Sequence, residues 1–419
     1  MTTASTAPTA ATHTAPSVGI AGQATSSRIA SIDIFRGLTM AVMIFVNELA
    51  DVRGLPWWTY HAKRDWNLMT YVDMVYPFFL FIVGLAIPLA IRARLKKNPS
   101  IPALWWHVVS RSISLIVLGL ILANADKVDP ALTHLSGHTW GLLGLVGGVL
   151  YWNVYADSKR YKVLFRVLRI AGLLLMVAMY AIFRCVTPSG QVGWIDGSYP
   201  EILGLIGYTY LSVAALYLIT RRWLWAPLGW FVALVAFNAF ATLNWLQFPN
   251  RLPHYFWPLD NGCGAFITMG GVVTSVIFLG HHRWSTAREK MLLAVAFAVP
   301  ALVAGYLLTP LGISKIRATP TWGLYCVGAA VLCFTLLYWI CDVKKRTAWA
   351  LPVRPAGANT LLTYLLPDFY AFILGITGWT YLEHRFSFGW PGVVKSVIFT
   401  FCILGISSLL TRCRLRMQL

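Results

Sequence analysis

Apolar segments of membrane-spanning length alternate with short polar segments along almost the whole chain. A helix that crosses a bilayer needs about 20 apolar residues, and windows of about 18–22 residues identify about twelve such segments. The longest polar gaps are about twenty residues, which leaves no room for a separate soluble domain. The pattern predicts an all-α polytopic membrane bundle with ten to twelve transmembrane helices. The segments centre near residues 42, 81, 116, 148, 174, 210, 235, 272, 300, 331, 368 and 401.

Composition agrees with this interpretation. Of the 419 residues, 58% are hydrophobic and only 12% are charged, whereas a soluble domain carries about 25% charged residues. A net charge of +19 is high enough to suggest nucleic acid, but the positions of the basic residues argue against that partner. The N-terminus and every second loop hold 24 of the 34 Lys and Arg residues, and the alternate loops hold eight. Because cytoplasmic loops are rich in Lys and Arg, we expect both termini in the cytoplasm.

Residues 1–27 form a segment of a different kind. They contain no charged side chain and are rich in Thr, Ala and Ser. They also lack the basic start and the continuous apolar core of a signal peptide. We expect 1–27 to be a disordered cytoplasmic tail and 28–419 to be the membrane domain.

Cysteine and histidine spacing gives little sign of a disulfide framework or a metal site. The seven cysteines lie mostly inside apolar segments and form no CxxC pair. Cys185 and Cys263 fall near outward loops, and the sequence leaves open whether they form a disulfide. His134 and His138 are four residues apart, but no HExxH motif accompanies them. We therefore expect no bound metal.

The first apolar segment carries a line of polar side chains. On an ideal helix Asp33, Arg36 and Asn47 fall on one face, together with two methionines. Arg36 and Asn47 are about 16 Å apart along such a helix. His61 follows on an outward loop, and Asp73 borders the second apolar segment. Charged groups within hydrocarbon are costly unless they face a partner or a cavity, so this line indicates a functional site.

A purely structural interpretation of the same residues remains open. Asp33 and Arg36 are three apart and suited to neutralise one another at the interface. A loop histidine such as His61 is usually solvated, and Asn47 stands where the helix ends. Spacing alone does not choose between a site and these structural roles.

Several separated motifs make the chain resemble one known family. The motifs are SIDIFRG with MIFVN, His61 followed by WN, T-x-x-D-x-V-x-P-F-F-L-F-I-x-G, ILGLIGYTYL, GISKIRATPTWGLY, CDV and GANTLLTYL. In this order, over most of residues 28–419, they resemble the heparan-α-glucosaminide N-acetyltransferase family and its bacterial relatives. The resemblance implies transfer of an acetyl group from cytoplasmic acetyl-CoA to an amino sugar across the membrane. It also implies a homodimer in a bacterial inner membrane.

The resemblance assigns roles residue by residue. His61 matches the active-site histidine, Asn47 the family's asparagine, and Asp73 the aspartate of T-x-x-D. Asp33 and Arg36 match the first block, and we expect them to bind the coenzyme together with Asn359 of the GANTLLTYL block, which matches its asparagine.

Two departures leave the acceptor open. Lys63, Arg64 and Asp65 are inserted charges beside His61, and the large luminal domain of the animal enzyme has no counterpart. A periplasmic amino sugar or an envelope glycan is therefore the expected acceptor rather than heparan.

These assignments give a chemical hypothesis. Histidine is the side chain suited to act as a general base near neutral pH, so His61 fits that role, and the Asn47 amide suits the developing oxyanion. Asp73 orients the imidazole, and Arg36 binds a coenzyme phosphate. Direct transfer and an acetyl-histidine intermediate both remain open.

A later outward loop carries Lys315, Arg317 and Trp322. An aromatic ring beside hydrogen-bond donors is typical of sugar recognition, so we expect these three to contact the acceptor. An interfacial tryptophan anchor is the alternative.

Two other classes of protein fit part of the pattern. Intramembrane polar groups and proline-broken helices also occur in transporters, so an amino-sugar transporter is the runner-up. A structural partner in envelope assembly is the third possibility. A base beside an outward amide favours the enzyme, since a carrier needs no such pair.

Overall fold

The computed structural model describes residues 29–156, 160–246, 261–280 and 283–419. The expected tail, residues 1–27, lies outside these ranges, so its disorder stays a prediction. The α-helices are α1 (Ala30–Leu49), α2 (Val75–Lys97), α3 (Ile101–Asn124), α4 (Pro130–Thr133), α5 (Gly137–Trp152), α6 (Lys162–Ile182), α7 (Glu201–Thr220), α8 (Ala226–Thr242), α9 (Cys263–Leu279), α10 (Ala287–Leu307), α11 (Pro320–Tyr338), α12 (Arg354–Ala358), α13 (Thr360–Thr377), α14 (Tyr381–Arg385) and α15 (Gly389–Arg412). Short 3-10 turns are η1 (Trp57–Thr59), η2 (Tyr71–Met74), η3 (Ala125–Lys127), η5 (Thr309–Leu311) and η7 (Ala348–Ala350), and η6 (Trp339–Val343) is a π-helical turn after α11.

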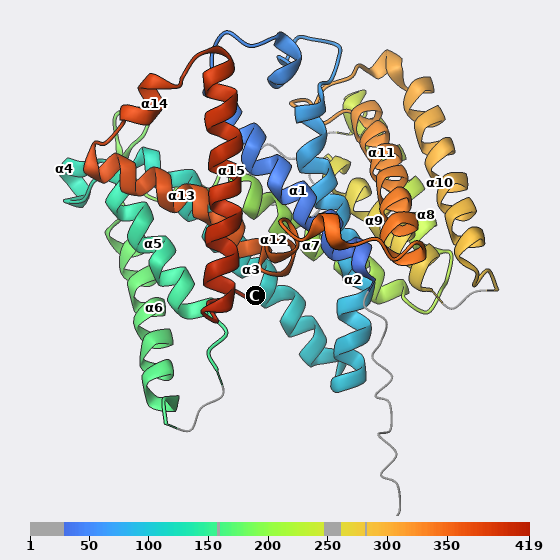
Figure 1. Ribbon diagram of the computed structural model, residues 1–419, viewed down its shortest axis with the longest axis horizontal. Coiled ribbons are helices and arrows are strands. Elements are labelled where there is room, and N and C mark those ends of the chain that lie inside the picture. Colours follow the sequence, from blue (N-terminus) through green and yellow to red (C-terminus); the bar gives the residue numbers. More distant parts are fainter. Residues whose placement is uncertain (1–28, 157–159, 247–260, 281–282) are drawn as a thin grey trace, which may run out of the picture.

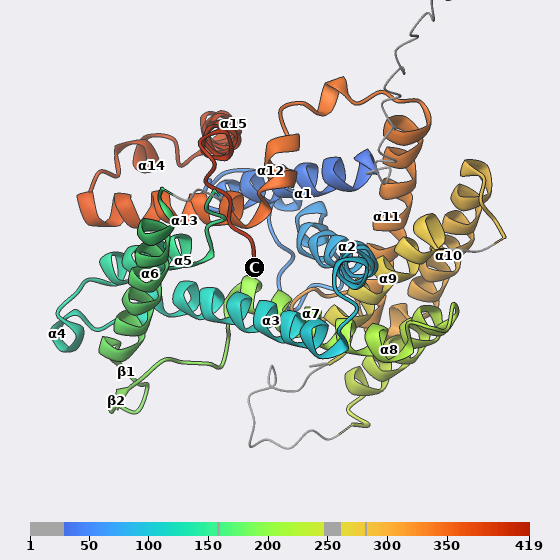
Figure 2. The same cartoon turned by 90° about the horizontal axis from the view of Figure 1, so that it is seen from below.

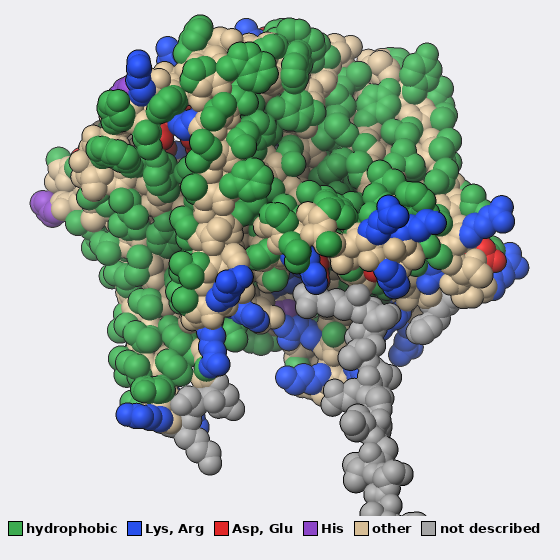
Figure 3. Space-filling model, in the orientation of Figure 1, with side chains coloured by type: hydrophobic (Ala, Val, Ile, Leu, Met, Phe, Trp, Pro, Cys, Tyr) green, Lys and Arg blue, Asp and Glu red, His purple; other side chains and the backbone are tan. Residues whose placement is uncertain are grey.

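The helices confirm the prediction of an all-α polytopic membrane protein. Within the described ranges, nine helical segments are long and apolar enough to cross a membrane, and α8 and α9 are shorter apolar helices. Every predicted segment centre lies inside a helix. Lys and Arg side chains gather mainly at the lower edge of the molecule in Figure 3. The exact number of spans and the side of each terminus stay predictions.

Close helix packing fixes the position of α2, which follows the first candidate site residues. A Cβ atom on Gly84 of α2 would overlap the Thr268 carbonyl of α9, and one on Gly271 would overlap the Phe81 carbonyl. Only glycine permits this approach of two backbones, as small residues do between membrane helices. Helices α2 and α9 therefore form one rigid pair (Figures 1 and 2).

Helix α13 departs from a simple succession of parallel spans. Figure 1 shows α15 running from top to bottom, whereas α13 lies across it. In the view from below, α15 is seen end-on and α13 still lies lengthwise (Figure 2). Its 18 residues are long and apolar enough in sum to count as a span, but length and apolarity do not fix the direction of a helix.

The strands are confined, among described residues, to the small hairpin β1 (Cys185–Val186) and β2 (Val192–Gly193), paired antiparallel with Cys185 opposite Gly193. No disulfide joins Cys185 to Cys263, both of which are described and buried. The Cys185 thiol contacts the carbonyl of Trp194, and the Cys263 thiol contacts that of Thr319. The structure therefore shows that Cys185 and Cys263 do not form a disulfide with each other.

Candidate active site

The loop between α1 and α2 carries the candidate catalytic residues, and it lies at the top of the molecule in Figure 1. Its fold is set by its own hydrogen bonds. The Tyr60 hydroxyl donates to the Val52 carbonyl at 2.6 Å and accepts from the Leu55 amide at 3.2 Å. The Thr70 hydroxyl donates to the Tyr60 carbonyl at 2.8 Å. These contacts draw the two ends of the loop together and bring His61 beside the start of α2.

Asp73 is the buried anchor of this arrangement, with a side chain only 1% exposed. It lies in η2, where Thr70 and Asp73 form a reciprocal capping box. The Asp73 Oδ2 atom accepts from the amides of Thr70 at 3.0 Å and Ala62 at 3.2 Å. A buried carboxylate needs such donors, because an unpaired one would be strongly destabilising. The remaining oxygen, Oδ1, is directed at His61.

The Asp73 Oδ1 atom holds one side of the His61 ring, and the rest of the side chain is partly exposed at the surface of the loop. Its Nδ1 lies 2.7 Å from Asp73 Oδ1, and the side chain is 45% exposed. An ionised carboxylate only accepts hydrogen bonds, so Nδ1 carries the proton and Nε2 keeps its lone pair. The geometry is that of an imidazole oriented to act as a base or a nucleophile at Nε2.

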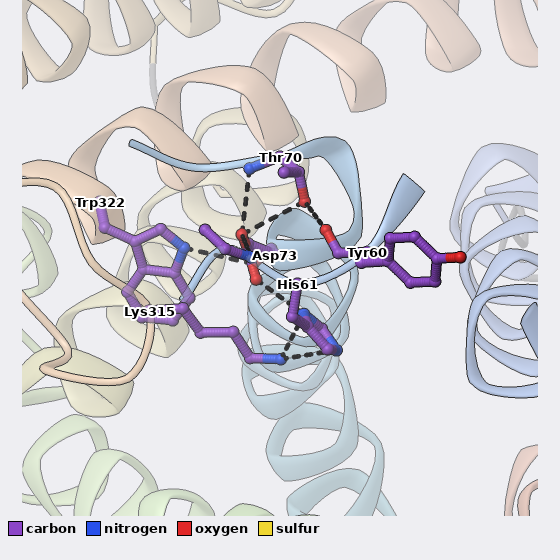
Figure 4. Close-up of polar contacts among 7 residues, drawn as sticks. Tyr60, His61, Thr70, Asp73, Lys315 and Trp322 are labelled. Atoms are coloured by element: carbon purple, nitrogen blue, oxygen red, sulfur yellow. Dashed lines mark hydrogen bonds and ion pairs between the residues drawn. The ribbon is translucent and has the colours of Figure 1, made fainter. Parts of the chain in front are cut away.

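Lys315 completes the cluster from a distant part of the chain (Figure 4). Its Nζ lies 3.3 Å from Nδ1 and 3.4 Å from Nε2 of His61. Burial lowers the pKa of Lys315 below its usual value of 10.5, and the nearby Asp73 carboxylate opposes that shift. A substrate-binding role was expected for this lysine; the structure places it in direct contact with the candidate base.

Trp322, expected to recognise the acceptor, lies behind the site instead. Its indole is 3% exposed, and its Nε1–H donates to the backbone carbonyl of Asp73 at 3.2 Å. No ring face is free to stack on a sugar, so the role that fits is support of Asp73. Arg317 is exposed, and its amide donates to the Ser314 hydroxyl at 3.3 Å.

Asn47 does not join the hydrogen-bonded cluster. Its residue is exposed at the end of α1, and none of the described hydrogen bonds links its amide to His61, Asp73 or Lys315. The two methionines expected on the polar face of α1 are buried in an apolar cluster with residues of α2, α12 and α15. That face of α1 is therefore polar only at its two ends.

The three residues expected to bind the coenzyme are committed to contacts within the protein. Arg36 donates to the Gly357 carbonyl at 3.2 Å and lies 3.6 Å from the Asp33 carboxylate. Asn359 is 2% exposed, and its amide nitrogen donates to the Thr411 hydroxyl at 3.1 Å and to the Leu415 carbonyl at 2.9 Å. Its amide oxygen accepts from the backbone of the C-terminal segment. A coenzyme-binding role for them remains a prediction.

Aromatic side chains on the loop that carries His61 were missed by the sequence reasoning. Trp57 and Trp58 are 55% and 52% exposed, and Tyr71 is 39% exposed. The Trp58 and Tyr71 ring centres are 6.2 Å apart, and those of Trp57 and Trp66 are 6.0 Å apart. The sequence feature that could have indicated them is the adjacent pair of tryptophans in a polar loop.

Known proteins place this chain in a family. Residues 28–246, just over half of the chain, match the family described as "Domain of unknown function (DUF5009)". The chain is 35% identical over 146 residues to heparan-alpha-glucosaminide N-acetyltransferase of Mus musculus, covering 32% of this chain and 21% of that protein. It is 37% identical over 99 residues to the Homo sapiens protein of the same name, covering 24% and 14%. The matched segments are about a fifth or less of these relatives. The chain belongs to the DUF5009 family, and the resemblance to the heparan-α-glucosaminide N-acetyltransferases that its motifs predicted is confirmed.

Proposed function

We propose that this protein is a transmembrane N-acetyltransferase of the bacterial inner membrane. It moves an acetyl group from cytoplasmic acetyl-CoA to the amine of an amino sugar or envelope glycan on the outer side. The observation that carries the proposal is the 2.7 Å contact between His61 Nδ1 and the buried Asp73 carboxylate. The names of the two animal relatives support the acetyl-transfer chemistry.

The reaction follows from the orientation of His61. The neutral acceptor amine attacks the thioester carbonyl, an N–C bond forms, and negative charge moves to the carbonyl oxygen. His61 Nε2 takes the proton that the nitrogen loses. The C–S bond then breaks, and the proton passes from the imidazole to the leaving CoA sulfur. In the two-step variant Nε2 itself attacks the thioester carbonyl, the C–S bond breaks, and CoA leaves as a thiolate. The acceptor amine then attacks the acetyl carbonyl, the bond to Nε2 breaks, and the proton that the amine loses passes to the thiolate.

Lys315 is a cationic group in contact with the ring of His61. An ammonium carries three N–H donors, so one can face the imidazole while another faces a substrate oxygen. A fixed positive charge beside the carbonyl stabilises the oxyanion more than it stabilises the neutral thioester. The structure thus offers Lys315 for the role that was expected of Asn47.

Membrane vesicles of known sidedness test the proposal. Acetyl-CoA labelled in the acetyl group is supplied on one side, and a panel of amino sugars on the other. The proposal expects label in an amine product only when the donor is on the cytoplasmic side. Absence of labelled product with every amine and both orientations, from protein that remains folded, would contradict it.

A further inference from the structure

The hairpin of α2 and α3 carries an unusual excess of positive charge. No Asp or Glu occurs between residues 74 and 125, nor between residues 202 and 259, which include all of α7 except its first residue, Glu201. The same hairpin holds Arg92, Arg94, Arg111 and His107, as well as two lysines at its tip. It lies at the lower end of the molecule, where basic side chains gather (Figures 1 and 3).

Three of these groups lie together, although they come from two helices. Arg94 of α2 is within electrostatic range of Arg111 on α3, and His107 is within range of both arginines. Helix α3 packs along α7, where the ring of Tyr210 is buried. The Arg111 guanidinium carbon lies 4.8 Å from the centre of that ring. The cation–π contact holds the guanidinium in place without neutralising its charge.

This cluster has no counter-ion among the described residues. The described ion pairs involve neither Arg94, His107 nor Arg111. Solvated lysines at a hairpin tip need no partner, but Arg111 is only partly exposed. It stands ten residues into α3, about 15 Å along a helix from its start. Arg94, in the last turn of α2, is exposed, whereas His107 is partly exposed like Arg111. An anion between these groups would relieve the repulsion of like charges, which costs most for the partly exposed Arg111.

We propose that Arg94, His107 and Arg111 form a binding site for a phosphate ester. Two guanidinium groups offer planar pairs of donors that match phosphate oxygens, and arginine keeps its charge in partly buried surroundings. Two kinds of molecule bring this chemistry to the basic end of a membrane protein: a soluble nucleotide-bearing coenzyme and an anionic phospholipid. The coenzyme case rests on the proposed acetyl transfer, whereas phosphate binding itself does not.

The cluster of Arg94, His107 and Arg111 is better suited to bind a phosphate than Arg36 is. The Arg36 guanidinium already faces the Asp33 carboxylate and the Gly357 carbonyl, so part of its charge and of its donors is used. None of the ion pairs in the described ranges joins Arg94 or Arg111 to an acidic side chain. Asp73 lies in η2 just before α2, at the candidate site, whereas Arg94 lies in the last turn of α2, at the basic end.

Direct binding measurements test the site in the purified full chain. The test variant is Arg94→Gln with Arg111→Gln, and the matched control is Lys96→Gln with Lys97→Gln, which removes the same charge from the exposed tip. Affinity for CoA and for 3′-dephospho-CoA is measured by calorimetry in detergent. Thermal stability is compared in nanodiscs of phosphatidylglycerol and of phosphatidylcholine.

The expected result is a loss of at least about tenfold in CoA affinity for the test variant and little change for the control. If CoA affinity is unchanged but the phosphatidylglycerol-dependent rise in melting temperature is lost, the phosphate belongs to a lipid and the site stands. If neither changes, the proposal is overturned. An Arg94→Lys, Arg111→Lys variant keeps the charge but not the planar donor pairs, so it is expected to recover part of the binding, which separates loss of the site from misfolding. Acetyl transfer is not the readout, so its failure does not bear on this result.

Discussion

The Lys315 ammonium nitrogen lies 3.3 Å and 3.4 Å from the two ring nitrogens of His61, although 254 residues separate them in the sequence. The pair connects the loop before α2 with the loop before α11. It also places a cation and a candidate base at the same point, with the buried Asp73 carboxylate beside both.

Replacing Lys315 with Met removes the cation but keeps a long apolar stem. If the ammonium stabilises the oxyanion, acetyl transfer falls by about 10²–10³-fold, the usual cost of losing one such donor. Rates are measured with saturating acetyl-CoA in detergent. Arg385→Gln removes an exposed charge of α14 and is the matched control, since its rate is expected to change little. Equal rates for Lys315→Met and the control would show that Lys315 takes no part in the chemistry.

The same lysine gives a pH dependence with a definite sign. Burial lowers the pKa of folded Lys315 below 10.5, so above that lowered pKa the folded state binds fewer protons than the unfolded state. Stability therefore rises with pH between the folded pKa and 10.5, and it gains nothing further above that window. As the pH rises through this window, Lys315 loses its positive charge, so the transfer rate is expected to fall.

Lys315→Arg separates these two effects. Arginine keeps its charge, so the alkaline fall in rate is expected to move to higher pH or to disappear. The measurement is the pH profile of the turnover number from about pH 7 to about pH 10.5, the ordinary range of lysine titration. An identical alkaline limb in both proteins would assign that limb to another group.

Asp73→Asn tests the orientation of His61 with almost no change in volume. An amide cannot repeat the acceptor pattern of a carboxylate that faces Nδ1–H and two backbone amides. We expect a fall in transfer of roughly 10²–10⁴-fold, because the wrong tautomer then faces the substrate. Asp65→Asn, an exposed change in the same loop, is the control. A turnover number for Asp73→Asn that equals that of Asp65→Asn would exclude the orienting role.

Trp322→Phe distinguishes support of Asp73 from contact with a sugar. The substitution removes the indole donor to the Asp73 carbonyl in a buried place, which costs about 1–3 kcal/mol. The melting temperature is therefore expected to fall, with a similar loss of rate for every acceptor. Trp58→Phe, at an exposed ring, is expected to leave the melting temperature unchanged. A change in acceptor preference without loss of stability in Trp322→Phe would restore the sugar-binding role.

The fold was largely predictable because a bilayer requires about 20 apolar residues per helix, and this requirement is visible in one dimension. His61 and Asp73 could also be picked out from the sequence, since they lie twelve residues apart in a recognisable block. The sequence did not predict three other features: the direction of α13, the burial of Trp322 and the contact of Lys315 with His61. Each depends on how distant segments pack, and hydropathy contains no information about which helix meets which. Asn359 shows the same limit, because its motif did not reveal that the C-terminal segment uses its amide.

Asn359→Ala decides between that anchoring role and coenzyme binding. The amide makes hydrogen bonds to the Thr411 hydroxyl, the Leu415 carbonyl and the Met417 amide, and each is worth about 1 kcal/mol. We expect a loss of about 2–4 kcal/mol in unfolding free energy, together with faster amide exchange in the C-terminal segment. Hydrogen exchange with mass spectrometry and the KM for acetyl-CoA are measured on the same preparation, with Thr360→Ala as the neighbouring control. A raised KM with unchanged exchange at residues 411–417 would identify Asn359 as a coenzyme contact instead of an anchor.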